Sequence, residues 1–305
     1  MKRRDVVKWM GLAAVTSACP TVLSSSNPYF QKPGLQLFTV MKLLDQDFEG
    51  TLSAVQGIGY RTVETVGAFG KPASQVKELL QQYNLYTPSQ HLMPGTLYQD
   101  FSAYNQGKIG WDEIVKRFTY AFDFNRVEYF IEEAIGRAQT LGQDYIVWQL
   151  NWLPEYGKKE LKQHVKAFNT AGKMCKEAGL QFAFHNHDHE FTSVGDTTYY
   201  DLLVQNTAPD LVQLEMDFMW ATFAGADPVV YLKRYADRYK MVHLKDLTKD
   251  RKITIPGKGT ENFQNLLSVS EQVGVQYAFV EFDQPNAPMQ EIAEAYNYLT
   301  RIKKP

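Results

Sequence analysis

Short apolar runs alternate with longer amphipathic stretches from Gly34 to the end of the chain. The short runs are rich in β-branched and aromatic residues, which favours strands, whereas the longer stretches repeat apolar residues at helical spacing. We predict eight strands, at 35–40, 61–66, 85–92, 144–152, 180–187, 211–220, 239–246 and 275–283. The clearest predicted helices cover 47–57, 73–84, 127–142, 158–178 and 287–302.

Repeated strand–helix units over residues 34–305 predict a (β/α)8 TIM barrel that forms a single domain. Residues 93–125, rich in Tyr, Phe, Gly and Asp, do not fit the repeat and are predicted to be an insertion after the third strand. A doubly wound open sheet is the alternative fold. It is disfavoured because no glycine-rich phosphate loop follows any predicted strand.

The N-terminal sequence indicates an export signal and is not expected to form part of the barrel. Residues 1–24 have a basic start, a short apolar run and then small residues, and residues 25–33 resemble a linker. The pair Arg3-Arg4 resembles a twin-arginine signal, and the apolar run is too short to span a membrane. We therefore expect a periplasmic or otherwise exported protein, with Cys19 as an alternative site of lipid attachment.

Composition narrows the class of protein. With 44% hydrophobic and 22% charged residues, the chain has the composition of an ordinary globular protein. A formal net charge of −2 gives no electrostatic reason to expect a nucleic-acid partner. Two cysteines, at positions 19 and 175, cannot form a disulfide framework.

Metal-ligand residue types lie at the ends of four consecutive predicted strands. Half of the six histidines fall in "FAFHNHDHEF" at 182–191. In a TIM barrel the carboxyl ends of the strands meet at the active site, so His185, Asp217, His243 and Glu281 are expected to converge. Two imidazoles and two carboxylates suit a divalent ion, with manganese preferred and zinc, cobalt, iron or magnesium as alternatives.

The motifs "HNHDHEF", "LEMDFMWA", "HLKD" and "VEFD" resemble the strand ends of the xylose-isomerase-like TIM barrels, which include sugar phosphate isomerases and epimerases. The resemblance implies metal ligands from strands five to eight, usually Glu, Asp, His and Glu. The last three fall on Asp217, His243 and Glu281, whereas His185 departs from the usual Glu. The resemblance also implies a small-molecule sugar or glycoside as partner and a homodimer or tetramer.

A divalent ion next to a carbonyl acidifies the adjacent C–H through an enediolate. The sequence therefore predicts an isomerase or epimerase that acts on an unphosphorylated sugar or keto-sugar. The alternative is a lyase or dehydratase that eliminates the β-substituent of a 3-keto-glycoside. A non-catalytic periplasmic sugar-binding module is the third hypothesis.

Catalytic and substrate-binding roles are assigned by position relative to the strand ends. Glu281 is expected to be both ligand and acid/base, and His187 and Glu190 are candidates for the second acid/base, with support of the ligands as the alternative for His187. Glu64 is expected to be a solvated loop charge. The predicted substrate-binding residues are His91, Trp148, Trp220 and Lys245. The alternatives are a loop-anchoring role for His91, core packing for the tryptophans and an ion pair with Asp246 for Lys245.

Overall fold

The computed structural model describes residues 32–149, 156–283 and 287–303. The predicted export signal, Cys19 and most of the predicted linker therefore lie outside the described residues.

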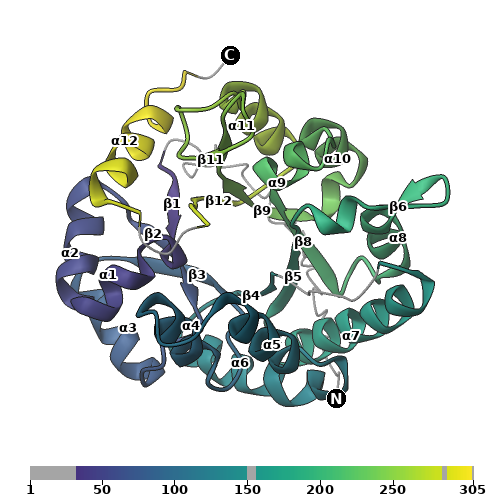
Figure 1. Cartoon of the computed structure of the whole chain (residues 1–305), viewed down its shortest axis with the longest axis horizontal. Helices are drawn as coiled ribbons and strands as arrows, with labels where there is room; N and C mark the ends of the chain where they lie inside the picture. Colours follow the sequence, from purple (N-terminus) through teal and green to yellow (C-terminus); the bar gives the residue numbers. More distant parts are fainter. Residues whose placement is uncertain (1–31, 150–155, 284–286, 304–305) are drawn as a thin grey trace, which may run out of the picture.

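Eight parallel strands close into a barrel in the order β1-β12-β9-β8-β5-β4-β3-β2, which confirms the predicted (β/α)8 fold (Figure 1). Each strand pairs in parallel with both of its neighbours. The barrel strands are β1 (Gly34–Gln36), β2 (Thr62–Val66), β3 (Tyr86–His91), β4 (Tyr145–Trp148), β5 (Gln181–His185), β8 (Val212–Asp217), β9 (Tyr239–Leu244) and β12 (Tyr277–Val280).

Helices surround the barrel on its outside (Figure 1). Their bounds are α1 (Met41–Gln46), α2 (Phe48–Ile58), α3 (Ala73–Gln82), α4 (Leu97–Asn105), α5 (Trp111–Ala121), α6 (Val127–Leu141), α7 (Lys158–Glu177), α8 (Tyr199–Asn206), α9 (Phe218–Phe223), α10 (Pro228–Arg234), α11 (Phe263–Gln272) and α12 (Met289–Leu299). Two short hairpins, β6 (Ser193–Val194) with β7 (Thr197–Thr198) and β10 (Asp246–Leu247) with β11 (Ile253–Thr254), follow β5 and β9.

Alternation along the strands decides which side chains reach the barrel interior. A small apolar cluster, formed by Tyr145, Val147, Ala183, Met241, Tyr277 and Phe279, is separate from the larger core between strands and helices. On β5, β9 and β12, the next residues in the same phase are His185, His243 and Glu281. The small apolar cluster therefore lies beneath the polar end of the barrel.

The barrel strands are shorter than predicted, and in β1 and β8 side chains that cap the following turn end the strand early. Gln36 ends β1, since its Oε1 accepts a hydrogen bond from the N–H of Phe38 at 3.0 Å and starts a 3-10 turn. Asp217 ends β8, since its Oδ1 accepts from the N–H of Trp220 at 2.9 Å and caps α9.

The predicted insertion after the third strand forms α4 and α5. Tyr98 on α4 donates a hydrogen bond to Asp45 at 2.6 Å, and Arg117 on α5 pairs with Asp100 on α4 at 2.5 Å. Figure 1 shows the two helices closer to the centre of the barrel than α3 or α6. The insertion is therefore anchored to the barrel beside its opening.

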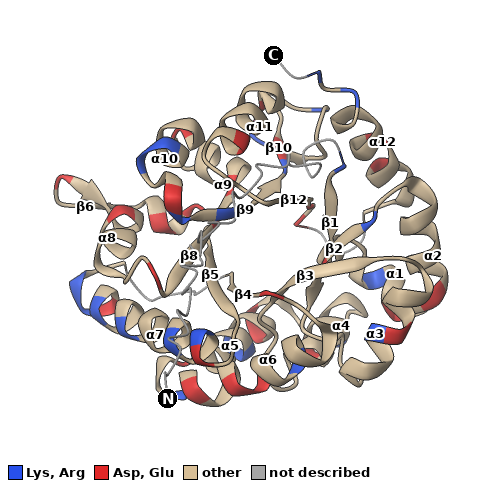
Figure 2. Cartoon of the chain, turned by 180° about the vertical axis from the view of Figure 1, so that it is seen from behind, with Lys and Arg blue, Asp and Glu red and all other residues tan. Residues whose placement is uncertain are grey.

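Charged residues of both signs are interspersed over the outer helices (Figure 2). This pattern agrees with the small net charge of the chain. Within the described ranges, no helix combines the length and apolar character needed to cross a membrane.

Candidate metal centre and active site

The four ligands predicted from the sequence converge at the carboxyl ends of the barrel strands. His185, Asp217 and His243 come from β5, β8 and β9, and Glu281 directly follows β12. One ligand atom from each lies within 4.8 Å of the others, and all four side chains are buried. We call these four residues the outer set.

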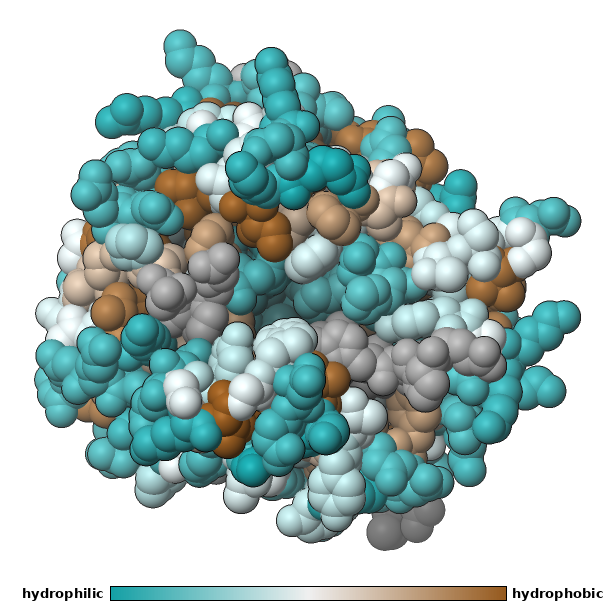
Figure 3. Space-filling view, viewed as in Figure 1, coloured by the Kyte–Doolittle hydropathy of each residue, from teal (hydrophilic) through white to brown (hydrophobic). Residues whose placement is uncertain are grey.

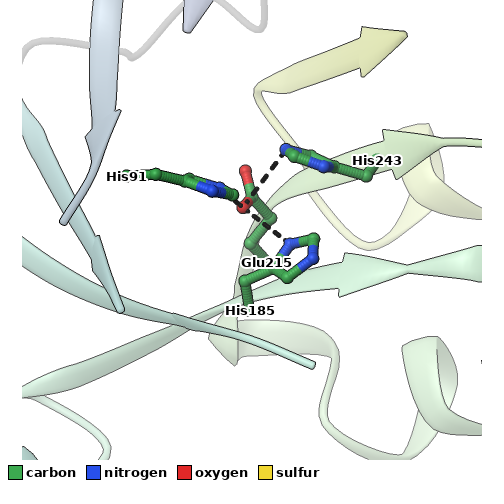
Figure 4. A group of neighbouring side chains, drawn as sticks. All are labelled: His91, His185, Glu215 and His243. Atoms are coloured by element: carbon green, nitrogen blue, oxygen red, sulfur yellow. Dashed lines mark hydrogen bonds and ion pairs between the residues drawn. The ribbon is translucent and has the colours of Figure 1, made fainter. Parts of the chain in front are cut away.

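A second group lies deeper in the barrel and shares two residues with the outer set. His91, His185, Glu215 and His243 also bring ligand atoms within 4.8 Å of one another. Figure 4 shows the three imidazoles arranged around Oε2 of Glu215. The distances to that oxygen are 3.0 Å from His91 Nε2, 3.0 Å from His185 Nδ1 and 3.3 Å from His243 Nε2.

The imidazoles of His185 and His243 belong to both groups, and each directs one ring nitrogen toward the outer set and the other toward the deeper group. His185 directs Nε2 toward Asp217 Oδ2 at 3.6 Å and Nδ1 toward Glu215. His243 directs Nδ1 toward Glu281 Oε2 at 2.7 Å and Nε2 toward Glu64 Oε2 at 2.7 Å. Each ring thus connects an outer carboxylate to a deeper one, an arrangement in which the deeper carboxylate can orient a metal-ligating histidine.

The deeper carboxylates, Glu64 and Glu215, were not assigned to the site from the sequence. Both are fully buried, and Glu64 also accepts a hydrogen bond from Gln36 Nε2 at 2.8 Å. The prediction of a solvated loop charge at Glu64 is therefore wrong. Glu215 precedes Asp217 by two residues on β8, so strand alternation was the signal that could have found it.

Lys245 lies among the outer carboxylates. Its Nζ is 2.8 Å from Asp217 Oδ2, 2.7 Å from Glu281 Oε2 and 2.5 Å from Asp283 Oδ1. Burial opposes the charged form, but these carboxylates outweigh it and raise the pKa of Lys245 well above its ordinary value. The residue is fully buried and does not line the cavity, so its predicted contact with substrate is corrected to an internal ion pair.

Buried negative charge exceeds buried positive charge in this cluster. Five carboxylates, those of Glu64, Glu215, Asp217, Glu281 and Asp283, face three cationic groups. Lys245 contacts the last three of them. Although burial opposes the charged imidazoles, Glu64 and Glu215 raise the pKa of His91 to about 9. In the same way, Glu215 and Glu281 raise the pKa of His243 well above its ordinary value. Burial raises the pKa of Asp217 to about 6 despite the opposing effect of Lys245. A divalent cation would supply the missing positive charge, and the mixed nitrogen and oxygen donors fit manganese, iron, cobalt or zinc. The donor set therefore fits a metal ion.

A cavity of about 640 Å³ opens above this cluster. His91, His185 and Glu281 lie on its polar side, together with His187 and Trp220. Figure 3 shows this side of the molecule hollowed at its centre, with hydrophilic residues at depth. His91 and Trp220, both predicted to contact substrate, are therefore placed to do so.

His187 is a neutral imidazole at the cavity wall. Its Nδ1 lies 3.2 Å from the carbonyl oxygen of Gln149, which can only accept, so Nδ1 carries the proton and Nε2 keeps its lone pair. Burial, followed by the charges of His185 and Lys245, holds the pKa of His187 well below its ordinary value. A neutral imidazole with a free lone pair can accept a proton from a substrate.

Besides Lys245, the predicted site residues Glu190 and Trp148 do not line the cavity. Glu190 is fully buried and accepts a hydrogen bond from the backbone N–H of His187 at 2.9 Å, so it supports the loop instead of facing substrate. Trp148 is also fully buried, with its ring 4.9 Å from Phe130 on α6 and 5.2 Å from Phe168 on α7. It follows Val147, which faces the barrel interior, so alternation turns Trp148 toward the helices.

Known proteins with similar sequences include inosose dehydratases. That of Clostridium tetani is 31% identical over 170 residues, which cover 48% of this chain and 56% of the relative. That of Clostridium beijerinckii is 23% identical over 282 residues, which cover 85% of this chain and 89% of the relative. The match thus spans about half the length of the Clostridium tetani relative and of a similar Bacillus anthracis relative. It spans most of the length of the Clostridium beijerinckii relative.

Similar folds occur in solved structures. A sugar phosphate isomerase/epimerase from Parabacteroides distasonis is 25% identical with a TM-score of 0.70, over 89% of this chain and 99% of that one. The model of the xylose isomerase-like TIM barrel family matches residues 52–302. The chain therefore belongs to the xylose isomerase-like TIM barrel family.

Proposed function

We propose that the protein is a divalent-metal-dependent lyase of the dehydratase type. In this proposal it removes the proton next to the carbonyl of an unphosphorylated, sugar-derived ketone and then expels the β-substituent. The observation that carries the proposal is one neutral imidazole, His187, at the wall of a cavity whose polar side holds two residues of a mixed histidine and carboxylate ligand set.

The outer set is the proposed metal site. A metal held by His185, Asp217, His243 and Glu281 leaves the other nitrogen of each imidazole free to donate to Glu215 or Glu64. An ion in the deeper group would instead leave Asp217 and Glu281 neutralised by Lys245 alone. A divalent ion supplies positive charge to a substrate oxygen and thereby acidifies the neighbouring C–H.

Proton transfer is assigned to His187. Its Nε2 takes the proton from the carbon next to the carbonyl, and the C–H electron pair forms the enediolate of the substrate. When the β C–O bond breaks, that pair becomes the new double bond, and the imidazolium returns its proton to the departing oxygen. The carboxylate of Glu281 is held by His243 and Lys245 at 2.7 Å each, so its pKa stays well below the ordinary value although burial opposes this. Because His243 and Lys245 already engage its Oε2, Glu281 is assigned to metal binding rather than to proton transfer.

Elimination is preferred to epimerisation because the site is asymmetric. A two-glutamate epimerisation needs carboxylates on opposite faces of the substrate, and β5 supplies the imidazole of His185 where the second glutamate would stand. The similarity to inosose dehydratases also supports elimination. This order reverses the expectation from the sequence, which placed isomerase or epimerase first.

An isomerase or epimerase is the second candidate. The similarity to a sugar phosphate isomerase/epimerase at 25% identity supports it, as does the position of Glu281 at the cavity. A sugar-binding module without catalysis does not need the outer set or the deeper carboxylates, and so explains fewer of the buried groups.

An unphosphorylated substrate is supported by the charges at the cavity. Among the residues that the structure describes, neither lysine nor arginine lines it, whereas Asp188, Glu281 and Asp283 do. A phosphate group there would meet carboxylates without a basic partner. The predicted export agrees with this, since phosphorylated sugars are cytoplasmic.

The function is tested by NMR in deuterated water, with manganese-loaded protein and either free sugars or methyl 3-keto-glucoside. We expect loss of the substituent from the keto-glucoside and deuterium next to the carbonyl in substrate that returns from the intermediate. His187→Gln should slow the reaction by about 10²–10⁴-fold. His189→Gln is the matched control for an altered cavity wall, because this imidazole lies on the same loop and also lines the cavity, but its side chain is 43% exposed and pairs with Asp188. Deuterium exchange without elimination would favour an isomerase or epimerase. No reaction with any of the sugars would refute both the lyase and the epimerase proposals.

Export is proposed as well, on the basis of residues 1–24. Replacing Arg3-Arg4 with two lysines should leave the protein in the cytoplasm, folded and with its metal site intact. Cell fractionation checks this, and export of the variant at the level of the unaltered chain would contradict a twin-arginine signal.

A further inference from the structure

One side of the cavity is an aromatic wall. We use this name for six aromatic side chains that line the cavity: Phe38, Phe101, Tyr104, Trp111, Phe118 and Phe223. Four of the six come from α4 and α5, the insertion between β3 and β4. The catalytic strand ends therefore supply the polar side of the cavity, and a separate segment supplies most of its apolar side.

Ring contacts join five of the six side chains of the aromatic wall into two groups. Phe101 lies 5.8 Å from Phe38 and 6.2 Å from Phe118, in edge-to-face arrangements. Tyr104 lies 5.8 Å from Trp111, which is 52% exposed. The wall thus extends from buried rings to a half-exposed indole at the solvent edge.

The wall is also held in place without a ligand. The hydrogen bond of Tyr98 to Asp45 ties α4 to α1, and the pair of Arg117 with Asp100 ties α5 to α4. Phe101 and Phe118 are buried, which fixes their rings against the core. A preformed apolar surface binds a flat group without the cost of ordering mobile side chains.

The cavity is larger and more apolar than a monosaccharide requires. A hexose has about 12 non-hydrogen atoms, whereas cavities of roughly 300–1,000 Å³ enclose drug-sized molecules. A hexose bound at the outer set would leave the aromatic wall facing water. Exposed apolar surface beside a polar site usually marks a binding surface.

We propose that the aromatic wall binds a flat apolar substituent carried by the substrate, so that the substrate is a glycoside-like molecule with an aromatic group attached to its sugar part. This inference rests on the proposed function for the placement of the sugar part at the outer set. Among its six side chains, the wall has only two hydrogen-bonding groups, the hydroxyl of Tyr104 and the indole N–H of Trp111. A second sugar ring, with hydroxyls on every side, would leave most of them unpaired.

Binding of 2-naphthyl β-glucoside, methyl β-glucoside and cellobiose to the full chain tests the proposal, with Kd measured by calorimetry. We expect the naphthyl glucoside to bind at least tenfold more tightly than the methyl glucoside. The double variant Tyr104→Ala with Trp111→Ala should lose that preference. Tyr120→Ala is the matched control, because Tyr120 is on α5, is 70% exposed and does not line the cavity.

The outcomes separate this inference from the proposed function. Equal affinity for the naphthyl and methyl glucosides would overturn it, as would a preference that survives in the double variant. Cellobiose binding as tightly as the naphthyl glucoside would assign the wall to a second sugar and also overturn it. The same comparison in Asp217→Asn, which lacks a ligand of the outer set, gives the second readout. Naphthyl preference retained there would support the wall even if the proposed reaction fails.

Discussion

Lys245 Nζ lies 2.7 Å from Glu281 Oε2, and both side chains are almost completely buried. The same ammonium contacts Asp217 and Asp283, so one lysine neutralises carboxylates that the proposed metal would also bind. The lysine and a divalent ion thus supply positive charge to the same oxygens.

Lys245→Met should therefore destabilise the metal-free protein by about 3–5 kcal/mol, the usual cost of leaving a buried charge unpaired. Added manganese should recover much of the loss, so the rise in Tm between chelator and manganese should be larger in the variant. Lys252→Met is the control, because its pair with Asp250 is exposed and contributes little. An equal rise in Tm in the variant and the unaltered protein would mean that lysine and metal do not share these carboxylates.

Glu215→Gln tests the deeper carboxylates. A neutral amide orients His185 less strongly, so the affinity for manganese or zinc should fall about 10–100-fold while the metal still binds. Competition with a chelating dye measures the change. Asp217→Asn is the comparison, since Asn can still cap α9 but a ligand carboxylate is lost, and its metal content should fall to background. Complete metal loss in Glu215→Gln would instead place the ion in the deeper group.

His185→Glu tests whether β5 sets the reaction. The variant rebuilds a pair of glutamates around the outer set and should keep its metal. If the protein is a lyase, we expect deuterium exchange next to the carbonyl to continue while elimination slows. Product analysis by NMR distinguishes the two, and unchanged products at an unchanged rate would refute a role for His185 in choosing the reaction.

The buried His164, which lies outside the candidate site, should make the stability of the protein depend on pH. It is buried on α7, 3.1 Å from the hydroxyl of Tyr199, and burial lowers its pKa from 6.5 to about 3. The unfolded chain therefore binds this proton below pH 6.5 and the folded chain does not, so stability falls as pH decreases. The slope approaches about 1.4 kcal/mol per pH unit between those values.

Urea unfolding at pH 7, 6 and 5 measures the effect. His164→Gln should be less stable than the unaltered chain at pH 7 but lose less stability on acidification. Parallel losses in the two proteins would show that His164 is not responsible.

Much of the barrel was predictable from the hydrophobic periods of its strands and helices. The outer set was predictable from the sequence spacing of the strand ends. Parallel strands separated by helices bring their carboxyl ends together, so His185, Asp217, His243 and Glu281 could be expected to converge from their places in the chain. The depth of Glu215 and the outward turn of Trp148 depend on strand phase at single-residue precision.

Other features were not predictable because they depend on contacts between distant segments. Glu64 is buried because Gln36 and His243 provide partners from β1 and β9, and neither is near it in sequence. Lys245 was expected at the cavity, yet three carboxylates hold it inside the protein. Pairing of this kind needs the closed barrel and leaves no local pattern.

The separation between strand-end chemistry and the inserted helices has a consequence for divergence within such barrels. The proposed ligands lie at the carboxyl ends of β5, β8, β9 and β12, whereas most of the aromatic wall belongs to the insertion that carries α4 and α5. Exchange of that insertion between related chains could alter which molecules are accepted while the metal chemistry is inherited unchanged. Substrate range and reaction type could then evolve as independent modules of one barrel.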